Sequence, residues 1–170
     1  MKKRAYFLDH RGNDWPAFEL WRQYFVSPHD KRRFVTGTNE GNLTIEGVDG
    51  TDCLERPNRV SVQLVFSCKA DFGVQFMYSK LGRGGGQTYF SRGDLRRLRE
   101  FTKSDHNAPL PIGFFIPCEL GLEVVERFDR TNGDLPDCIE WISSSTLPFD
   151  FWPDVSTAWW EDENRIFIPS

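Results

Sequence analysis

The sequence predicts an α+β fold in which a mainly antiparallel sheet has about three helices packed on it, within one domain spanning residues 1–170. Apolar and polar residues alternate with period two in residues 60–67 and 72–78, which is typical of strands with one buried face. Apolar residues recur at spacing four over residues 120–128, which indicates an amphipathic helix. Hydrophobic residues make up 39% and aromatics 15% of the 170 residues, enough for an ordered core.

The first part of the chain predicts a strand and a helix. Residues 4–8 are expected to form a short first strand. Asn13 or Asp14 would cap a helix that has Pro16 in its first turn and ends near Val26. Its aromatic side chains, spaced by three and four residues, are expected in the core.

The middle of the chain predicts most of the sheet. Residues 33–36 and 43–46 are short strand candidates, and the Gly-, Asp- and Pro-rich residues 47–59 predict a surface loop. The two alternating segments are separated by a short connection, so we expect them to pair as an antiparallel hairpin. Residues 88–90 would continue the sheet after a glycine-rich turn.

A second helix is expected to open at residues 91–94. Leu95, Leu98 and Phe101 would face inward, leaving basic residues on the opposite face: Arg92, Arg96, Arg99 and Lys103. Two interpretations of this face stay open. It is either a solvated surface or a contact for nucleic acid or an acidic partner. A polar and then proline-rich connection, residues 104–113, would follow.

Residues 114–142 carry the clearest succession of signals. The apolar run 114–116 predicts a strand, and Pro117 fits the first position of a helix, where its missing N–H costs nothing. Asn132 and Gly133 provide a left-handed helix stop, and residues 138–142 predict another strand. The remaining chain predicts irregular structure, with a last strand from Arg165 to Ile168.

Composition bounds the classes of function. A net charge of −4 makes general nucleic-acid binding unfavourable. The basic start of the chain is followed by an apolar run too short for a signal peptide, and no stretch is long enough to span a membrane, so we expect a cytoplasmic protein. Four cysteines and three histidines show no close ligand spacing, and no nucleophile has a matched base. We therefore expect no metal, no cofactor, no catalytic residues and no enzymatic activity.

An acidic segment that contains tryptophans predicts a binding surface. Residues 134–164 hold eight carboxylates and no Lys or Arg. Trp141 is expected in the core, whereas the later tryptophans lie in loop-like sequence between acids. Aromatic anchors within a charged rim are typical of protein interfaces. The expected partner-binding residues are Asp150, Trp152, Asp154, Trp159, Trp160, Glu161, Asp162 and Glu163. The alternative is that these tryptophans fold back onto the sheet and the acids are solvated.

Residues 114–142 also resemble the C-terminal half of the first-numbered family of immunity proteins from bacterial polymorphic toxin systems. The residues that carry this resemblance are Ile116, Pro117, Leu122, Val125, Phe128, Thr131, Gly133, Pro136, Ile139, Glu140 and Trp141. Residues 1–60 show no matching motif.

The resemblance implies a bacterial antitoxin that binds and neutralises a cognate toxin used in competition between bacteria. In this family the toxin often has a nucleic-acid deaminase fold, and the inhibitor blocks its active site or substrate groove. The implied protein is a monomer or a 1:1 heterodimer with the toxin, and contacts neither membrane nor nucleic acid. The alternative function is a nucleic-acid-binding module that uses the basic face of residues 92–103.

Overall fold

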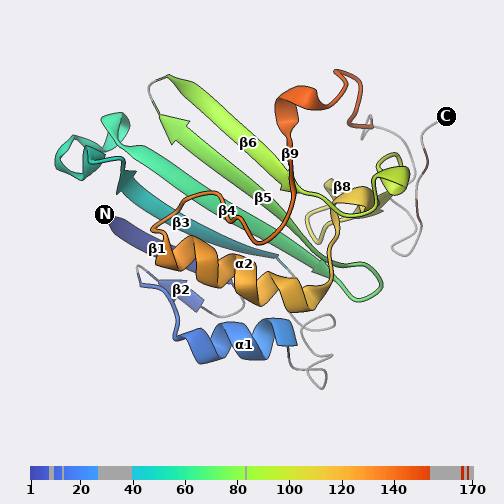
Figure 1. The fold of residues 1–170 in the computed structure, drawn as a ribbon, viewed down its shortest axis with the longest axis horizontal. Coiled ribbons are helices and arrows are strands. Elements are labelled where there is room, and N and C mark those ends of the chain that lie inside the picture. The colour runs from blue at the N-terminus through green and yellow to red at the C-terminus, as the bar shows by residue number, and fades with distance from the viewer. Residues whose placement is uncertain are drawn as a thin grey trace.

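A seven-stranded antiparallel sheet forms the centre of the computed structural model, which describes residues 1–7, 10–12, 14–26, 40–82, 84–153, 166 and 168 (Figure 1). Its strand order is β2-β1-β3-β4-β5-β6-β9. The strands are β1 Lys2–Phe7, β2 His10–Gly12, β3 Glu40–Val48, β4 Val60–Lys69, β5 Gly73–Gly82, β6 Gly85–Ser91 and β9 Trp141–Ser143.

Two α-helices occur in the described part of the chain: α1 Phe18–Val26 and α2 Cys118–Arg130. A separate hairpin pairs β7 Phe101–Lys103 with β8 Pro109–Pro111. The α+β class and the antiparallel sheet are therefore confirmed, whereas the expectation of about three helices is wrong. None of the described helices has the length and apolar character needed to cross a bilayer.

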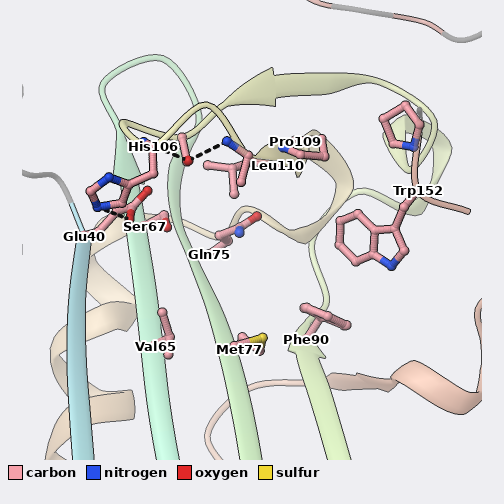
Figure 2. A pocket seen from close by; sticks show the side chains of 13 residues that line it. Glu40, Val65, Ser67, Gln75, Met77, Phe90, His106, Pro109, Leu110 and Trp152 are labelled. Carbon is pink, nitrogen blue, oxygen red and sulfur yellow. Dashed lines mark hydrogen bonds and ion pairs between the residues drawn. The ribbon is translucent and has the colours of Figure 1, made fainter. Parts of the chain in front are cut away.

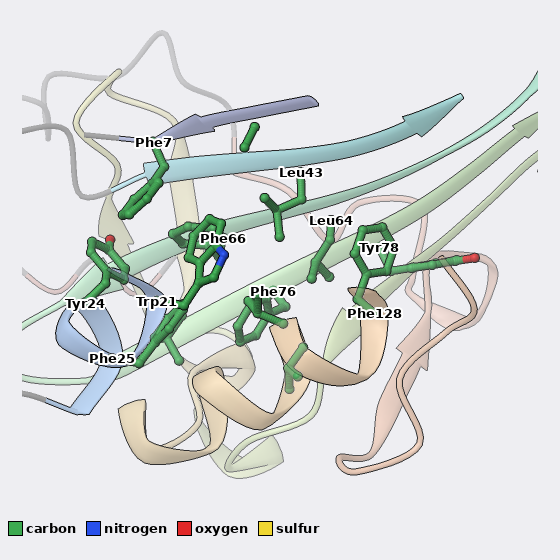
Figure 3. Close-up of a cluster of buried hydrophobic side chains, with 14 of the residues drawn as sticks. Phe7, Trp21, Tyr24, Phe25, Leu43, Leu64, Phe66, Phe76, Tyr78 and Phe128 are labelled. Atoms are coloured by element: carbon green, nitrogen blue, oxygen red, sulfur yellow. The ribbon is translucent and has the colours of Figure 1, made fainter. Parts of the chain in front are cut away.

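Both helices pack on one face of the sheet. Trp21 and Phe25 of α1 and Phe128 of α2 are buried against strand residues such as Leu64 and Phe76 (Figure 3). The other members of this core include Phe7, Tyr24, Leu43, Ile45, Phe66, Val124 and Val125. Val124 and Phe128 of the spacing-four pattern that predicted α2 are buried, whereas Leu120, its first member, is exposed.

Phe66 lies at the centre of this core because a glycine makes room for it. Gly41 is its register partner on β3, and a Cβ added there would lie only 2.0 Å from the tip of the Phe66 ring. The ring also contacts the rings of Phe7, Trp21 and Tyr24 at centroid distances of 5.5–6.3 Å. A larger residue at position 41 would displace this aromatic cluster.

The helix expected after residue 91 does not form. Residues 95–97 make one 3-10 turn, in which the Asp94 side chain accepts the Arg96 N–H at 3.1 Å. The chain then enters β7, where residues 101–103 gain backbone hydrogen bonds from β8 and Phe101 becomes completely buried. Non-local pairing thus overrides the helical spacing of the leucines. As a result, Arg92, Arg96, Arg99 and Lys103 do not share a helix face.

Other boundaries differ in smaller ways. Residues 112–114 form a 3-10 turn, and the expected strand at 114–116 is reduced to one antiparallel bridge between Ile116 and Val74. Ser91 holds this segment to the sheet, because its hydroxyl donates to the Phe114 carbonyl at 2.6 Å. The hairpin of residues 60–67 and 72–78 is confirmed as β4 and β5. The strand candidate at 33–36 lies outside the described residues, as does the last strand except for Ile166 and Ile168, which are not in a strand.

Candidate partner-binding site

A hollow of about 530 Å³ lies on the sheet face opposite the two helices (Figure 2). Its floor is formed by β3, β4, β5 and β6, and its cover by the β7–β8 hairpin and the Trp152 side chain. The floor residues alternate along their strands with the core residues of the first face, which is why they point away from the helices. The volume lies within the range of about 300–1,000 Å³ that is usual for ligand pockets.

The floor consists of two cross-strand rows. Glu40, Ser67 and Gln75 are register partners on β3, β4 and β5 and form a polar row. The neighbouring row is apolar, with Val65, Met77 and Phe90 as register partners on β4, β5 and β6. Antiparallel pairing sets each row side by side, so the hollow is polar towards one end and apolar towards the other.

Two acceptor atoms on this floor have no hydrogen-bond partner. They are Oε1 of Glu40 and Oε1 of Gln75, both buried. The Gln75 residue is only 8% exposed, and Figure 2 shows its amide between the Glu40 end and the Trp152 end of the hollow. A buried acceptor without a partner costs about 1–3 kcal/mol. Both oxygens have almost no accessible surface, so a donor placed in the hollow would recover part of this cost once the Glu40 or Gln75 side chain turns its oxygen towards that donor.

His106 is held over the polar end by its own tight turn. The Ser104 hydroxyl accepts the backbone N–H groups of His106 and Ala108 at 3.1 and 2.9 Å, and Asn107 adopts a left-handed conformation with φ 60°. The imidazole Nε2 lies 3.5 Å from Oε2 of Glu40. In the described part of the chain, no hydrogen bond joins this ring to a hydroxyl or thiol that it would activate as a nucleophile.

Trp152 and Pro153 line the apolar end of the hollow, in a segment that also contains Phe149 and Phe151. Phe151 is the buried anchor of this segment and packs against Phe101 and Phe114 at centroid distances of 5.9 and 5.8 Å. Trp152 is 45% exposed and meets Phe90 edge to face at 5.7 Å. Phe149 is fully exposed. We call Phe149, Asp150 and Trp152, together with the hollow, the aromatic surface.

The described residues include two of the eight expected partner-binding positions. Asp150 is largely exposed and lies 3.7 Å from the Arg99 guanidinium, and Trp152 borders the hollow as described. Trp152 therefore both folds back onto the sheet and keeps an exposed edge. Trp141 is half-buried against Tyr78, with its indole N–H donating to the Pro136 carbonyl at 2.6 Å. The remaining expected positions lie outside the described residues: Asp154, Trp159, Trp160, Glu161, Asp162 and Glu163.

The four arginines between residues 92 and 99 pair with carboxylates. Arg92 pairs with Glu140 at 2.9 Å, Arg97 with Glu100 at 2.7 Å and Arg96 with Asp94 at 2.8 Å. Lys103 is buried. The Arg96 guanidinium and backbone N–H both donate to Asp94 and lower the pKa of its carboxyl to about 2. These pairs reduce the positive potential that a phosphate backbone would meet, so the contacts of this region do not favour nucleic acid.

No group of three or more His, Cys, Asp or Glu side chains in the described ranges is arranged to hold a metal ion. The four cysteines are free thiols. Cys68 is buried, and burial raises the pKa of the Cys138 thiol above its ordinary value, which lowers its reactivity as a nucleophile. The aromatic surface offers apolar area, aromatic faces and unpaired acceptors.

No protein-family model, curated protein sequence or solved structure matches this chain. The resemblance to the immunity proteins therefore rests on the residues of 114–142. In the structure that segment supplies α2 and β9, and its buried members Val125 and Phe128 are scaffold.

Sequence reasoning singled out Trp152 and Asp150 as expected binding positions and did not anticipate the hollow or the exposed Phe149. The polar row comes from three strands and the cover from a fourth segment, so no local spacing connects these residues. Gln75 occupies the polar position between Val74 and Phe76 in the period-two pattern, so its place in the chain provided no separate signal.

Proposed function

We propose that this protein is an immunity protein that binds a cognate bacterial toxin through the aromatic surface and neutralises it by obstructing its active site or substrate groove. The observation that carries the proposal is the exposed Trp152 at the edge of a largely apolar hollow, three residues after the fully exposed Phe149 in the chain. Exposed aromatic groups of this size cost solubility unless a partner covers them. The resemblance of residues 114–142 specifies which kind of partner this is.

The aromatic surface has the composition of an interface centre. Trp152 is already fixed by edge-to-face contacts with Phe90 and Phe151, so binding would cost little side-chain entropy there. Phe149 contributes apolar area that is still fully accessible to solvent. Aromatic anchors next to a concave apolar site carry most of the binding free energy in many complexes.

The charge of the chain suits the expected partner. A toxin that acts on nucleic acid needs a basic groove for its substrate. The chain carries a net charge of −4, and its acidic residues are concentrated between positions 134 and 164. Opposite net charges accelerate association, and aromatic side chains beside carboxylates mimic the stacked bases and phosphates that such a groove holds.

The proposal is tested with the gene encoded beside that of this chain. We expect that gene to encode a large secreted protein ending in a toxin domain. The full chain, co-expressed with that domain, should restore growth of cells that the domain alone kills, and the two purified proteins should form a 1:1 complex in isothermal titration calorimetry. Cell death that continues at equal expression, together with the lack of a calorimetric signal, would exclude the immunity role.

A further inference from the structure

We propose that the hollow receives the side chain of an arginine from the protein partner, with its guanidinium group directed at the unpaired oxygens of Glu40 and Gln75. The inference rests on the proposed function, since the occupant belongs to the bound protein. It goes further by giving the chemistry that the hollow recognises.

The unpaired atoms require an occupant that donates hydrogen bonds. Both are acceptors, one from the carboxylate of Glu40 and one from the amide of Gln75. An occupant without N–H or O–H groups would leave both of them buried and unpaired. Because the terminal torsion of a glutamine is broad, the Gln75 amide can turn its oxygen towards a donor in the hollow without leaving a favourable rotamer.

The charge of Glu40 favours a cationic donor. Its Oε1 has no partner, and His106 is the only basic group within ion-pair distance of its other oxygen among the described residues, at 3.5 Å. Lys69 pairs with Asp105 at 3.1 Å and not with Glu40, so Oε1 of Glu40 remains open to a cation from a partner. A hydrogen bond between charged groups is about twice as strong as a neutral one.

The walls distinguish arginine from lysine. The apolar row of Val65, Met77 and Phe90 suits a methylene stem, and Trp152 and Phe90 present aromatic rings. A guanidinium is planar, weakly hydrated and able to stack on aromatic rings while it donates to two acceptors at once. The ammonium of lysine is compact and strongly hydrated, so it would lose more hydration free energy on entering an apolar hollow.

The two ends of the hollow match the two parts of the side chain. Glu40 and His106 lie at one end and Trp152 at the other, with Gln75 between them (Figure 2). A stem that passes Trp152 would bring its head group over the polar row. The partner's backbone would then lie against the aromatic surface, where Phe149 is exposed.

The test uses the full chain and three tripeptides, acetyl-Gly-X-Gly-amide, in which X is arginine, lysine or citrulline. Citrulline keeps the shape and most of the donors of arginine but removes its charge. We expect the arginine peptide to shift the NMR signals of the Met77 methyl and of the Gln75 side-chain amide. The lysine and citrulline peptides should bind at least about tenfold more weakly than the arginine peptide, as the loss of one charge-assisted hydrogen bond implies.

Variants of the hollow show which of its residues bind the arginine peptide. Gln75→Leu and Glu40→Gln should each weaken the arginine peptide about tenfold. Gln63→Leu is the matched control, because Gln63 lies on the same sheet face but outside the hollow, and it should leave the affinity unchanged. Equal binding of all three peptides, or NMR chemical-shift changes that persist in both hollow variants, would overturn the inference that the hollow receives an arginine side chain.

Binding of the toxin domain separates this inference from the proposed function. If the toxin binds the wild type and both hollow variants with equal affinity, the arginine site is wrong and the immunity role stands. If the arginine peptide binds selectively and no toxin binds, the recognition chemistry is supported and the proposed partner is wrong.

Discussion

Glu40 and Gln75 lie in one cross-strand row, joined in register through Ser67, and each keeps a buried side-chain oxygen without a hydrogen-bond partner. These unpaired oxygens lower the folding stability at positions where an apolar side chain would fit. A stability cost located at a hollow is the expected sign of a binding site.

Replacing Gln75 by leucine should therefore stabilise the isolated protein. Removal of the unpaired buried acceptor should raise the free energy of unfolding by about 1–3 kcal/mol, measured by urea denaturation. The control Gln63→Leu changes a partly exposed glutamine of β4 and should stay within about 0.5 kcal/mol of the wild type. A destabilised Gln75→Leu protein would show that the amide is satisfied in solution.

The Tyr78 hydroxyl should stabilise the folded protein, and part of this stability should be lost when the hydroxyl ionises at high pH. It donates to the Gly133 carbonyl at 3.0 Å just after α2 ends, and burial, with a smaller effect from the charge of Asp134, raises its pKa to about 12. Tyr78→Phe should lower the free energy of unfolding by about 1 kcal/mol at pH 7.

The sign of the pH effect follows from the raised pKa. An unfolded tyrosine ionises near pH 10, so the contribution of Tyr78 is fully present below about pH 10 and is lost as the pH rises towards about 12. The wild type should therefore lose more stability than Tyr78→Phe over this interval in urea denaturation. Parallel losses in the two proteins would contradict the assignment.

Asp94 should titrate far below other aspartates. Hydrogen bonds from the side chain and backbone of Arg96 lower its pKa to about 2, so its stabilising effect is present above about pH 4 and is lost as the pH falls towards 2. Carbon-13 NMR of the carboxyl group should show this midpoint. Arg96→Ala should raise it towards the ordinary value, whereas Arg97→Ala, which removes only a small electrostatic contribution, should change it little. An ordinary midpoint in the wild type would mean that the pair is open in solution.

The sequence predicted the elements of the fold whose residue patterns lie within one short segment of the chain. The period-two pattern predicted β4 and β5, because each strand buries one face against the helices. Leu95, Leu98 and Phe101 have helical spacing, yet Phe101 is buried in a hairpin whose other strand begins at Pro109. Pairing with a proline-rich segment eight residues away is a tertiary effect that spacing does not report.

The residues of the candidate site also differ in how local their sequence patterns are. Trp152 was singled out as a candidate from the sequence, because a tryptophan among acidic, proline-containing loop residues is a local pattern. The floor of the hollow was not, since Glu40, Ser67 and Gln75 become neighbours only when three strands align in one register. His106 lies in the predicted polar connection 104–113 and reaches Glu40 only through the β7–β8 hairpin.

Reversing the charge of the acidic positions beyond residue 153 should slow association with the toxin. Changing Asp154, Glu161, Asp162 and Glu163 to lysine should reduce the association rate about tenfold and make the affinity less sensitive to salt, as expected when electrostatic steering is lost. Stopped-flow measurements at two salt concentrations provide the check. Unchanged rates would remove these residues from the interface while leaving the aromatic surface in place.

The most direct test of the aromatic surface is the affinity of Phe149→Ala for the toxin domain, measured by calorimetry. Because the Phe149 side chain is fully exposed, its removal should leave the free energy of unfolding within about 0.5 kcal/mol of the wild type. Leu54→Ala, an exposed apolar change in the β3–β4 connection, is the matched control. We predict that Phe149→Ala weakens binding by about 2 kcal/mol and Leu54→Ala does not. Equal affinity of Phe149→Ala and wild type for a toxin that does bind would contradict the assignment of this surface.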